Sequence, residues 1–141
     1  AVVSETARLL KQGNIIAVKG IGGYLLLADA RNARAIQELR HRKNRPTKPF
    51  AVLFPSVEQA AACVEIRDAE REELESPESP IVLLRLRREA VTPAMQLIAP
   101  GLDRLGVMMP YAPLLLLLAE TFDGPLVATS ANISGSPIFF R

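Results

Sequence analysis

The sequence holds few of the residues on which disulfide, zinc and histidine chemistry depend. Cys63 is its only cysteine and His41 its only histidine, which excludes an internal disulfide and a zinc site built from several cysteines. We therefore expect no metal site made by protein side chains. A single cysteine is typical of a reducing compartment, and no secretory signal opens the sequence, so we expect the protein to be cytoplasmic.

Long apolar runs and catalytic clusters are also absent. The longest apolar run, Leu114 to Ala119, is far below the roughly 20 residues that span a bilayer, so we expect no membrane segment. His41 lies in a basic run without an acid to orient it, so no triad of nucleophile, base and acid is present. Any chemistry would therefore depend on positioning an anionic reactant and stabilising its charge.

The apolar segments predict a single α/β domain. At 141 residues the chain is long enough for one hydrophobic core. Most predicted strands are apolar on both faces and alternate with helical segments, which favours a mixed sheet with flanking helices. The predicted strands are 15–18, 24–28, 50–54, 81–85, 105–109 and 125–129. The predicted helices begin at the caps Ser4, Asn32, Ser56 and Asp68 or span 111–122, and 87–95 fits either a loop or a short helix.

One short segment carries the excess positive charge of the chain. Residues 40–48 hold five of the 17 Lys and Arg and no acid, whereas the other twelve stand against fifteen Asp and Glu. A cluster between a predicted helix and a predicted strand suits a compact polyanion such as a nucleotide triphosphate. The alternative is a solvated helix end whose cations offset the helix dipole. The five cations are Arg40, Arg42, Lys43, Arg45 and Lys48.

Two further loops can contact a ligand. The first, residues 19–23, has three glycines in four positions, which lets its backbone approach an anion closely. It lacks the ending of a P-loop, and the alternative is a tight hairpin. The second, residues 129–135, carries hydroxyl and amide groups after a buried strand, where ligands bind in α/β sheets. Its alternative is a loop that satisfies its own backbone.

Four separated blocks of sequence occur in the order that marks a known family. A Lys-x-Arg pair stands at Lys43-Asn44-Arg45, far upstream of a Ser-x-Asn at Ser130-Ala131-Asn132. Together with the segments 18–24, 42–49, 79–84 and 105–113, they resemble the YrdC-like domain, in particular the branch found inside the hydrogenase maturation protein HypF. The similarity runs from about Ala7 to Ile138 and implies a twisted mixed β-sheet with flanking helices and a basic concave face.

The resemblance implies a site for ATP with Mg²⁺. Lys43 and Arg45 would carry over as the catalytic residues, which bind phosphate and stabilise its charge. Ser130 and Asn132 would hydrogen-bond the nucleotide phosphates. The other residues expected to bind nucleotide or substrate are Lys19, Gly22, Gly23, Tyr24 and Lys48.

The HypF branch implies that carbamoyl-adenylate is formed from ATP and carbamate, which a separate acylphosphatase domain releases from carbamoyl phosphate. Another domain then passes the carbamoyl group to HypE, for the cyanide ligands of nickel–iron hydrogenase. Stand-alone YrdC-type enzymes instead make threonylcarbamoyl-adenylate for tRNA modification. They carry threonines where this chain has Gly20 and Gly22, which favours carbamate here. An RNA-binding module is a further alternative, although the cations are few and lack an aromatic platform.

The sequence departs from the HypF pattern in three places. Leu25 and Leu115 stand where HypF usually has histidine, so substrate handling is altered if either histidine takes part in it. The chain ends at residue 141, where family members continue. We therefore expect residues 1–141 to be a single YrdC-like domain, a C-terminally truncated fragment of a larger HypF-like protein.

Overall fold

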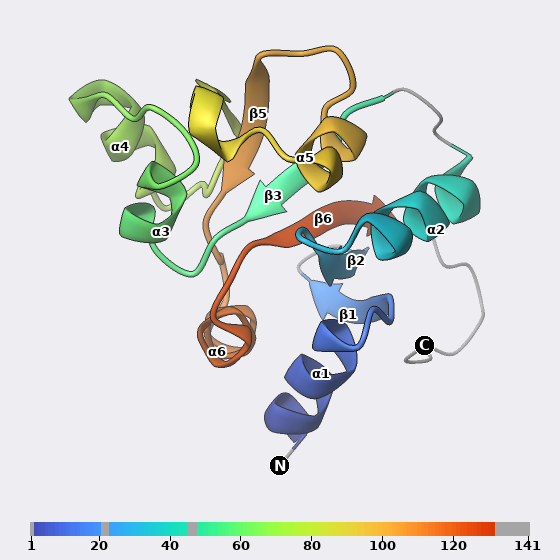
Figure 1. Ribbon diagram of the computed structural model, residues 1–141. Coiled ribbons are helices and arrows are strands. Elements are labelled where there is room, and N and C mark those ends of the chain that lie inside the picture. Colours follow the sequence, from blue (N-terminus) through green and yellow to red (C-terminus); the bar gives the residue numbers. More distant parts are fainter. Residues whose placement is uncertain (1, 21–22, 45–47, 132–141) are drawn as a thin grey trace.

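The computed structural model describes residues 2–20, 23–44 and 48–131, which form a twisted six-stranded sheet flanked by helices (Figure 1). The strands are β1 (Ile16–Gly20), β2 (Gly23–Asp29), β3 (Ala51–Leu53), β4 (Val82–Arg85), β5 (Arg104–Met108) and β6 (Leu126–Ala131). The helices are α1 (Val2–Lys11), α2 (Ala33–Lys43), α3 (Val57–Ala61), α4 (Asp68–Leu74), α5 (Pro93–Ile98) and α6 (Pro113–Phe122), with a short 3₁₀ helix, η1 (Arg88–Ala90). The predicted α/β class is confirmed. Not one of the described helices has both the length and the apolar character needed to cross a membrane.

The sheet is mixed, and its strand order differs from the order along the chain. The strands lie in the order β1-β2-β6-β3-β5-β4. β3 and β5 are parallel, whereas the other neighbouring pairs are antiparallel. β6, the last strand described, therefore lies in the interior of the sheet between the β1–β2 hairpin and β3 (Figure 1).

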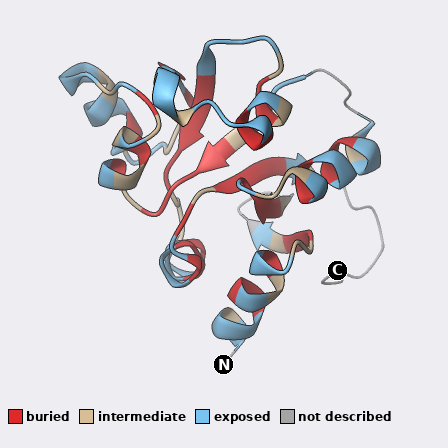
Figure 2. Ribbon diagram, in the orientation of Figure 1, coloured by how far each residue is buried: buried red, intermediate tan, exposed pale blue. Residues whose placement is uncertain are grey.

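Helices cover both faces of the sheet. On one face, Val52 and Val127 belong to a core that includes residues of α2 and α5, and we call this the α2 face. On the other, Leu53 and Leu126 pack with residues of α1 and α6, and we call this the α6 face. Figure 2 shows the buried residues along the central strands and on the inner sides of the helices. Burial on both faces explains why the strands appear in the sequence as nearly continuous apolar runs.

Local sequence accounts for several helix boundaries. The side chains of Asn32, Ser56 and Thr92 each accept a hydrogen bond from the backbone N–H three residues later, at 3.0, 3.1 and 3.1 Å. These bonds satisfy donors that the first turn of a helix leaves without a partner. At its other end α2 stops where Asn44 adopts the left-handed conformation, with φ of 52°. The predicted caps Asn32 and Ser56 are confirmed.

Other boundaries differ from the prediction. Ser4 does not cap the first helix, because α1 begins at Val2 and Val3 packs against the core. The residue before α4 that occupies the cap position is Arg67 and not Asp68. The undecided stretch 87–95 contains η1 and the beginning of α5. Tertiary packing and backbone pairing outweigh the local preferences at these positions.

Arg40, counted in the predicted basic cluster, is a structural residue. It is 8% exposed, and its guanidinium donates to the carbonyl oxygens of Leu97 at 2.7 Å, Ile98 at 3.0 Å and Lys48 at 2.8 Å. The same group lies over the ring of Phe50, 4.5 Å from its centre. Arg40 therefore satisfies carbonyls at the end of α5 and holds the segment that enters β3. This corrects the expectation that its charge belongs to the ligand site.

We predict that Arg40→Ala lowers the free energy of unfolding by about 2–4 kcal/mol, because buried carbonyls lose their donor and packing beside Phe50 is lost. Arg42→Ala is the matched control. Arg42 is exposed and pairs with Glu38 at 2.9 Å within one helical turn, a contact worth about 0.5 kcal/mol. Urea unfolding of the two variants measures the difference, and equal losses would contradict the structural role of Arg40.

Candidate functional site

Five cations of the described residues lie at one end of the sheet, which we call the basic end. β1, β4 and β6 finish there, β2, β3 and β5 begin there, and α2 delivers its last residue to it. Lys19 stands opposite Tyr24, which stands in turn opposite Ala131. The cations are Lys19, Lys43, Lys48, Arg85 and Arg104, all of them exposed except the half-buried Lys43.

Lys43 and Ser130 meet at the basic end although they lie 87 positions apart. The Lys43 Nζ donates a hydrogen bond to the backbone carbonyl oxygen of Ser130 at 2.7 Å. β3 pairs with β6 only over residues 126–128. Ser130 therefore lies beyond the end of β3, and its carbonyl oxygen is accessible to Lys43 from that side. The structure thus brings together one residue of each predicted motif. Arg45 and Asn132, the other two, lie outside the described residues.

The first residues of the predicted second loop belong to a strand. Ser130 and Ala131 belong to β6, because they pair with Leu25 and Tyr24 of β2. The pairing orients Ser130 by the alternation of the strand instead of leaving it in an irregular loop. Ser130 lies two residues beyond Ala128, so both are on the α6 face, and Ser130 is exposed there.

The described residues of the glycine-rich segment lie at the end of the β1–β2 hairpin. Gly20 stands opposite Gly23, which confirms the hairpin alternative, while Gly22 lies outside the described residues. A Cβ placed on Gly23 would meet no atom within 4 Å, so the side of the tip formed by this glycine is open. Lys19 is exposed and Tyr24 half-buried beside it. That these residues bind a ligand stays a prediction.

The predicted basic cluster divides in the structure. Arg40 is buried, and Arg42 forms an ion pair with an acid one turn earlier in α2. Lys48 is exposed, and its backbone carbonyl is held by Arg40. Among the cluster residues that the structure describes, Lys43 donates a hydrogen bond to β6. The run of charge in the sequence therefore contains a buried structural cation, cations exposed to solvent and a cation that contacts β6. Only burial and contacts in the structure distinguish them.

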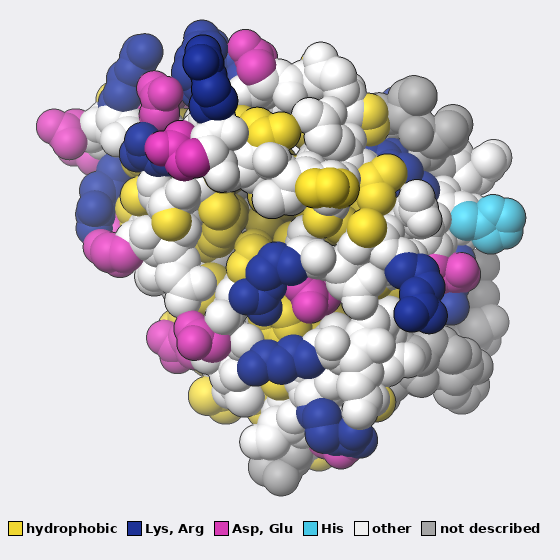
Figure 3. All heavy atoms as spheres, in the orientation of Figure 1, with side chains coloured by type: hydrophobic (Ala, Val, Ile, Leu, Met, Phe, Trp, Pro, Cys, Tyr) yellow, Lys and Arg dark blue, Asp and Glu magenta, His cyan; other side chains and the backbone are white. Residues whose placement is uncertain are grey.

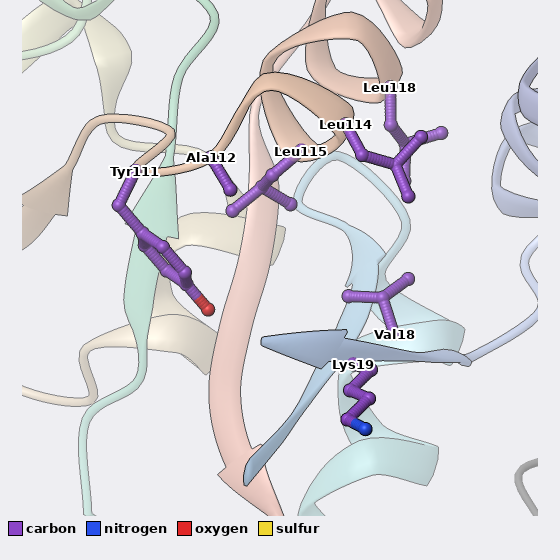
Figure 4. Close-up of a pocket in the computed structure, with 7 residues that line it drawn as sticks. All are labelled: Val18, Lys19, Tyr111, Ala112, Leu114, Leu115 and Leu118. Atoms are coloured by element: carbon purple, nitrogen blue, oxygen red, sulfur yellow. The ribbon is translucent and has the colours of Figure 1, made fainter. Parts of the chain in front are cut away.

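A small apolar cavity adjoins Lys19 (Figure 4). Its volume is about 50 Å³, and Val18, Tyr111 and leucines of α6 line it together with the stem of Lys19. Leu115, one of the two leucines noted above as departures from the expected pattern, is buried in its wall. Leu25, the other, stands opposite Ser130. Both leucines thus place an apolar side chain near the basic end.

A larger cavity of about 380 Å³ lies near the opposite end of the strands. Phe54, which follows β3, and Pro125, which precedes β6, line it together with Cys63. Figure 3 shows hydrophobic side chains in a hollow of this face of the molecule, with Lys and Arg side chains close by. Burial raises the pKa of the Cys63 thiol above its ordinary value. None of the predicted site residues lines this cavity.

Sequence reasoning did not single out Arg85 and Arg104. Each lies outside the charge run of residues 40–48, and they are 19 positions apart in the chain. They come together because β4 and β5 pair with Arg85 opposite Arg104. The available signal was that each arginine borders a predicted strand, but the strand register needed to join them is not readable from one sequence.

Comparison with known proteins identifies the fold family. The family Sua5/YciO/YrdC, described as "Telomere recombination", matches residues 8–141. The chain belongs to the Sua5/YciO/YrdC family.

Within the Sua5/YciO/YrdC family the similarity to HypF covers nearly the whole chain. Carbamoyltransferase HypF of Rhodobacter capsulatus is 47% identical over 135 residues, 96% of this chain and 18% of that protein. A full-length HypF, solved in a phosphate- and nucleotide-bound form, superposes with a TM-score of 0.86 at 43% identity, covering 96% of this chain and 18% of that one. The resemblance to HypF is confirmed, and the chain spans less than a fifth of these relatives.

The stand-alone branch of the Sua5/YciO/YrdC family is more distant. Threonylcarbamoyl-AMP synthase of Pyrococcus abyssi is 31% identical over 134 residues, which cover 93% of this chain and 38% of that protein. Sua5 of Pyrococcus abyssi, solved in complex with L-threonine, superposes with a TM-score of 0.78 at 28% identity, covering 96% of this chain and 40% of that one. Both branches therefore share the architecture described above, and the identities place this chain nearer to HypF.

We predict that Cys63 reacts slowly with iodoacetamide near neutral pH. Its raised pKa means that less thiolate is present at pH 8 than in an ordinary cysteine, and the thiolate is the nucleophile. The reaction rate plotted against pH should reach half of its maximum at a higher pH than for the cysteine of an unstructured, uncharged model peptide. Cys63 is the only cysteine, so the signal belongs to it, and a lower midpoint would contradict the effect of burial.

Proposed function

We propose that the chain binds ATP and joins it to carbamate as carbamoyl-adenylate, as the YrdC-like part of a HypF-type carbamoyltransferase in nickel–iron hydrogenase maturation. The observation that carries the proposal is the contact of Lys43 with Ser130 at 2.7 Å. This contact brings together one residue of the Lys-x-Arg pair and one residue of the Ser-x-Asn motif. The chain that contains them is 47% identical to a HypF. The nucleotide-bound state of a solved HypF supports a nucleotide ligand.

In the proposed reaction a carbamate oxygen attacks the α-phosphorus of ATP. A bond forms between that oxygen and phosphorus, the bond from phosphorus to the oxygen bridging to the β-phosphate breaks, and pyrophosphate leaves with the electron pair. Negative charge is spread over the phosphoryl oxygens during the transfer, so fixed cations and hydrogen-bond donors lower its energy. The basic end offers these groups and requires no covalent intermediate with the protein.

Lys43 suits the role of phosphate ligand in this reaction. Its ammonium has three N–H donors, and one of them is bound to the Ser130 carbonyl. The other two donors can face phosphate oxygens while the first keeps the side chain in place. The exposed hydroxyl of Ser130 lies on the same stretch of strand and can donate a further hydrogen bond. Arg45 would add a planar fork and Asn132 an amide, roles that follow from their residue types.

Mg²⁺ would enter the site with the nucleotide. The part of the chain that the structure describes contains no group of three or more His, Cys, Asp or Glu side chains suited to a metal ion. In nucleotide sites Mg²⁺ keeps several water ligands and is held largely by phosphate oxygens. The triphosphate, and not a protein cage, would therefore carry the ion.

Threonylcarbamoyl-adenylate synthesis is the second candidate, supported by 31% identity to the synthase of Pyrococcus abyssi. Gly20 counts against it, because a glycine offers no hydroxyl to hold the threonine side chain. In the proposed function the carbamoyl group passes instead to a HypE-like acceptor protein.

Exchange of labelled pyrophosphate into ATP distinguishes the candidates. We expect exchange with carbamate and none with threonine plus bicarbonate, whereas the reverse result would establish the synthase. RNA titrations at two salt concentrations form a third arm, because phosphate binding weakens steeply with salt. Salt-dependent RNA binding without nucleotide binding would replace both enzyme candidates.

We predict that Lys43→Ala and Arg45→Ala each weaken ATP binding by roughly 1–3 kcal/mol, since each removes a charge-assisted contact. Both variants should keep the unfolding midpoint of the parent protein. Arg42→Ala is the control, because it removes a neighbouring charge whose side chain pairs with Glu38. Titration calorimetry measures the affinities. Unchanged ATP affinity in both Lys43→Ala and Arg45→Ala would count decisively against the assignment.

A further inference from the structure

Arg104 lies in the same row of the sheet as Ser130. Ser130 is two residues beyond Ala128, which stands opposite Ala51 of β3. Ala51 also stands opposite Gly106 of β5, and Arg104 is two residues before Gly106. Residues opposite one another, or two apart along a strand, share a face of the sheet. Ser130 and Arg104 therefore lie on the α6 face, about 10 Å apart at two strand spacings.

Arg85 extends this row by one more strand, since it stands opposite Arg104. Like charges directly opposite each other destabilise a sheet. Asp103 offsets only part of the charge, because it approaches Arg85 at 3.4 Å with its own side chain 74% exposed. Arg104 makes no ion pair or side-chain hydrogen bond with the described residues. The pair therefore holds uncompensated positive charge.

The α6 face is open around these arginines. Leu83, two residues before Arg85 in β4, is 64% exposed, and Ile81 is 59% exposed. Farther along the same face, Leu53 and Leu126 are fully buried in the core with α6. An anion can therefore approach both guanidinium groups from the uncovered side, next to Ser130.

We propose that Arg104, assisted by Arg85, binds the β- and γ-phosphates of the nucleotide whose α-phosphate lies at Lys43 and Ser130. The proposal rests on the proposed function. Guanidinium groups form paired hydrogen bonds with phosphate oxygens. A triphosphate that extends along the row from Ser130, where Lys43 is bound, next reaches Arg104 and then Arg85. After the transfer the same two arginines hold the pyrophosphate. AMP does not reach them, so Arg104 distinguishes nucleoside triphosphate from monophosphate.

Titration of ATP, pyrophosphate and AMP into the purified protein and its Arg104→Ala variant tests the assignment. The dissociation constants of ATP and pyrophosphate should rise about tenfold or more, as expected for loss of a charged hydrogen-bond donor. The dissociation constant of AMP should not change. Arg88→Ala is the matched control, because Arg88 is an exposed arginine of η1 outside the row and should leave all three constants unchanged.

An equal loss of affinity for ATP and AMP would overturn the proposal, because Arg104 would then act on the adenosine part or on the fold. Unchanged ATP affinity in Arg104→Ala would overturn it as well. If the parent protein itself binds neither ATP nor pyrophosphate, the proposed function fails. That result is distinct from one in which the parent protein binds ATP and the Arg104→Ala variant does not behave as expected. Unfolding midpoints check the fold, and Arg104→Gln, which keeps most of the apolar stem, replaces the alanine variant if that one is unfolded.

Discussion

β6 forms hydrogen bonds on both of its sides, and the unequal length of its two neighbours opens the candidate site. It pairs with β2 over residues 126–131 but with β3 only over residues 126–128. On its β3 side, the end of β6 is therefore paired with none of the described strands. Lys43 reaches this gap from the end of α2 and donates to the carbonyl of Ser130. A longer β3 would satisfy that carbonyl itself and would separate the lysine from the strand.

Cations that lie close together in the sequence have different roles because they differ in burial. Arg40 and Lys43 are three residues apart, about one helical turn, yet Arg40 lies between α2 and α5 with its donors on backbone carbonyls. Lys43 extends past the last turn to the basic end. The buried arginine holds the segment before β3, and the lysine projects beside it. One run of charge thus supplies both a structural support and the lysine that we propose as a phosphate ligand.

Much of the fold was predictable because its elements are locally encoded. Each described strand coincides with an apolar run, and the side-chain oxygens of Asn32 and Ser56 mark helix starts that the structure confirms. Errors occurred where a distant partner decides the outcome. β6 continues through Ser130 because β2 pairs with it, and α1 starts before Ser4. The proximity of the motif residues Lys43 and Ser130 was predictable from the sequence, whereas the pairing of Arg85 with Arg104 was not.

The sequence alone determined the class of the fold, the family, and the residue types offered to an anionic ligand. These follow from periodicity, capping and motif order, all of which act over short stretches of chain. The tertiary structure alone decided that Arg40 is structural, that Lys43 touches Ser130, and that two separated arginines stand in one row. These features follow from strand register and burial, and both depend on which strands become neighbours once the whole chain has folded.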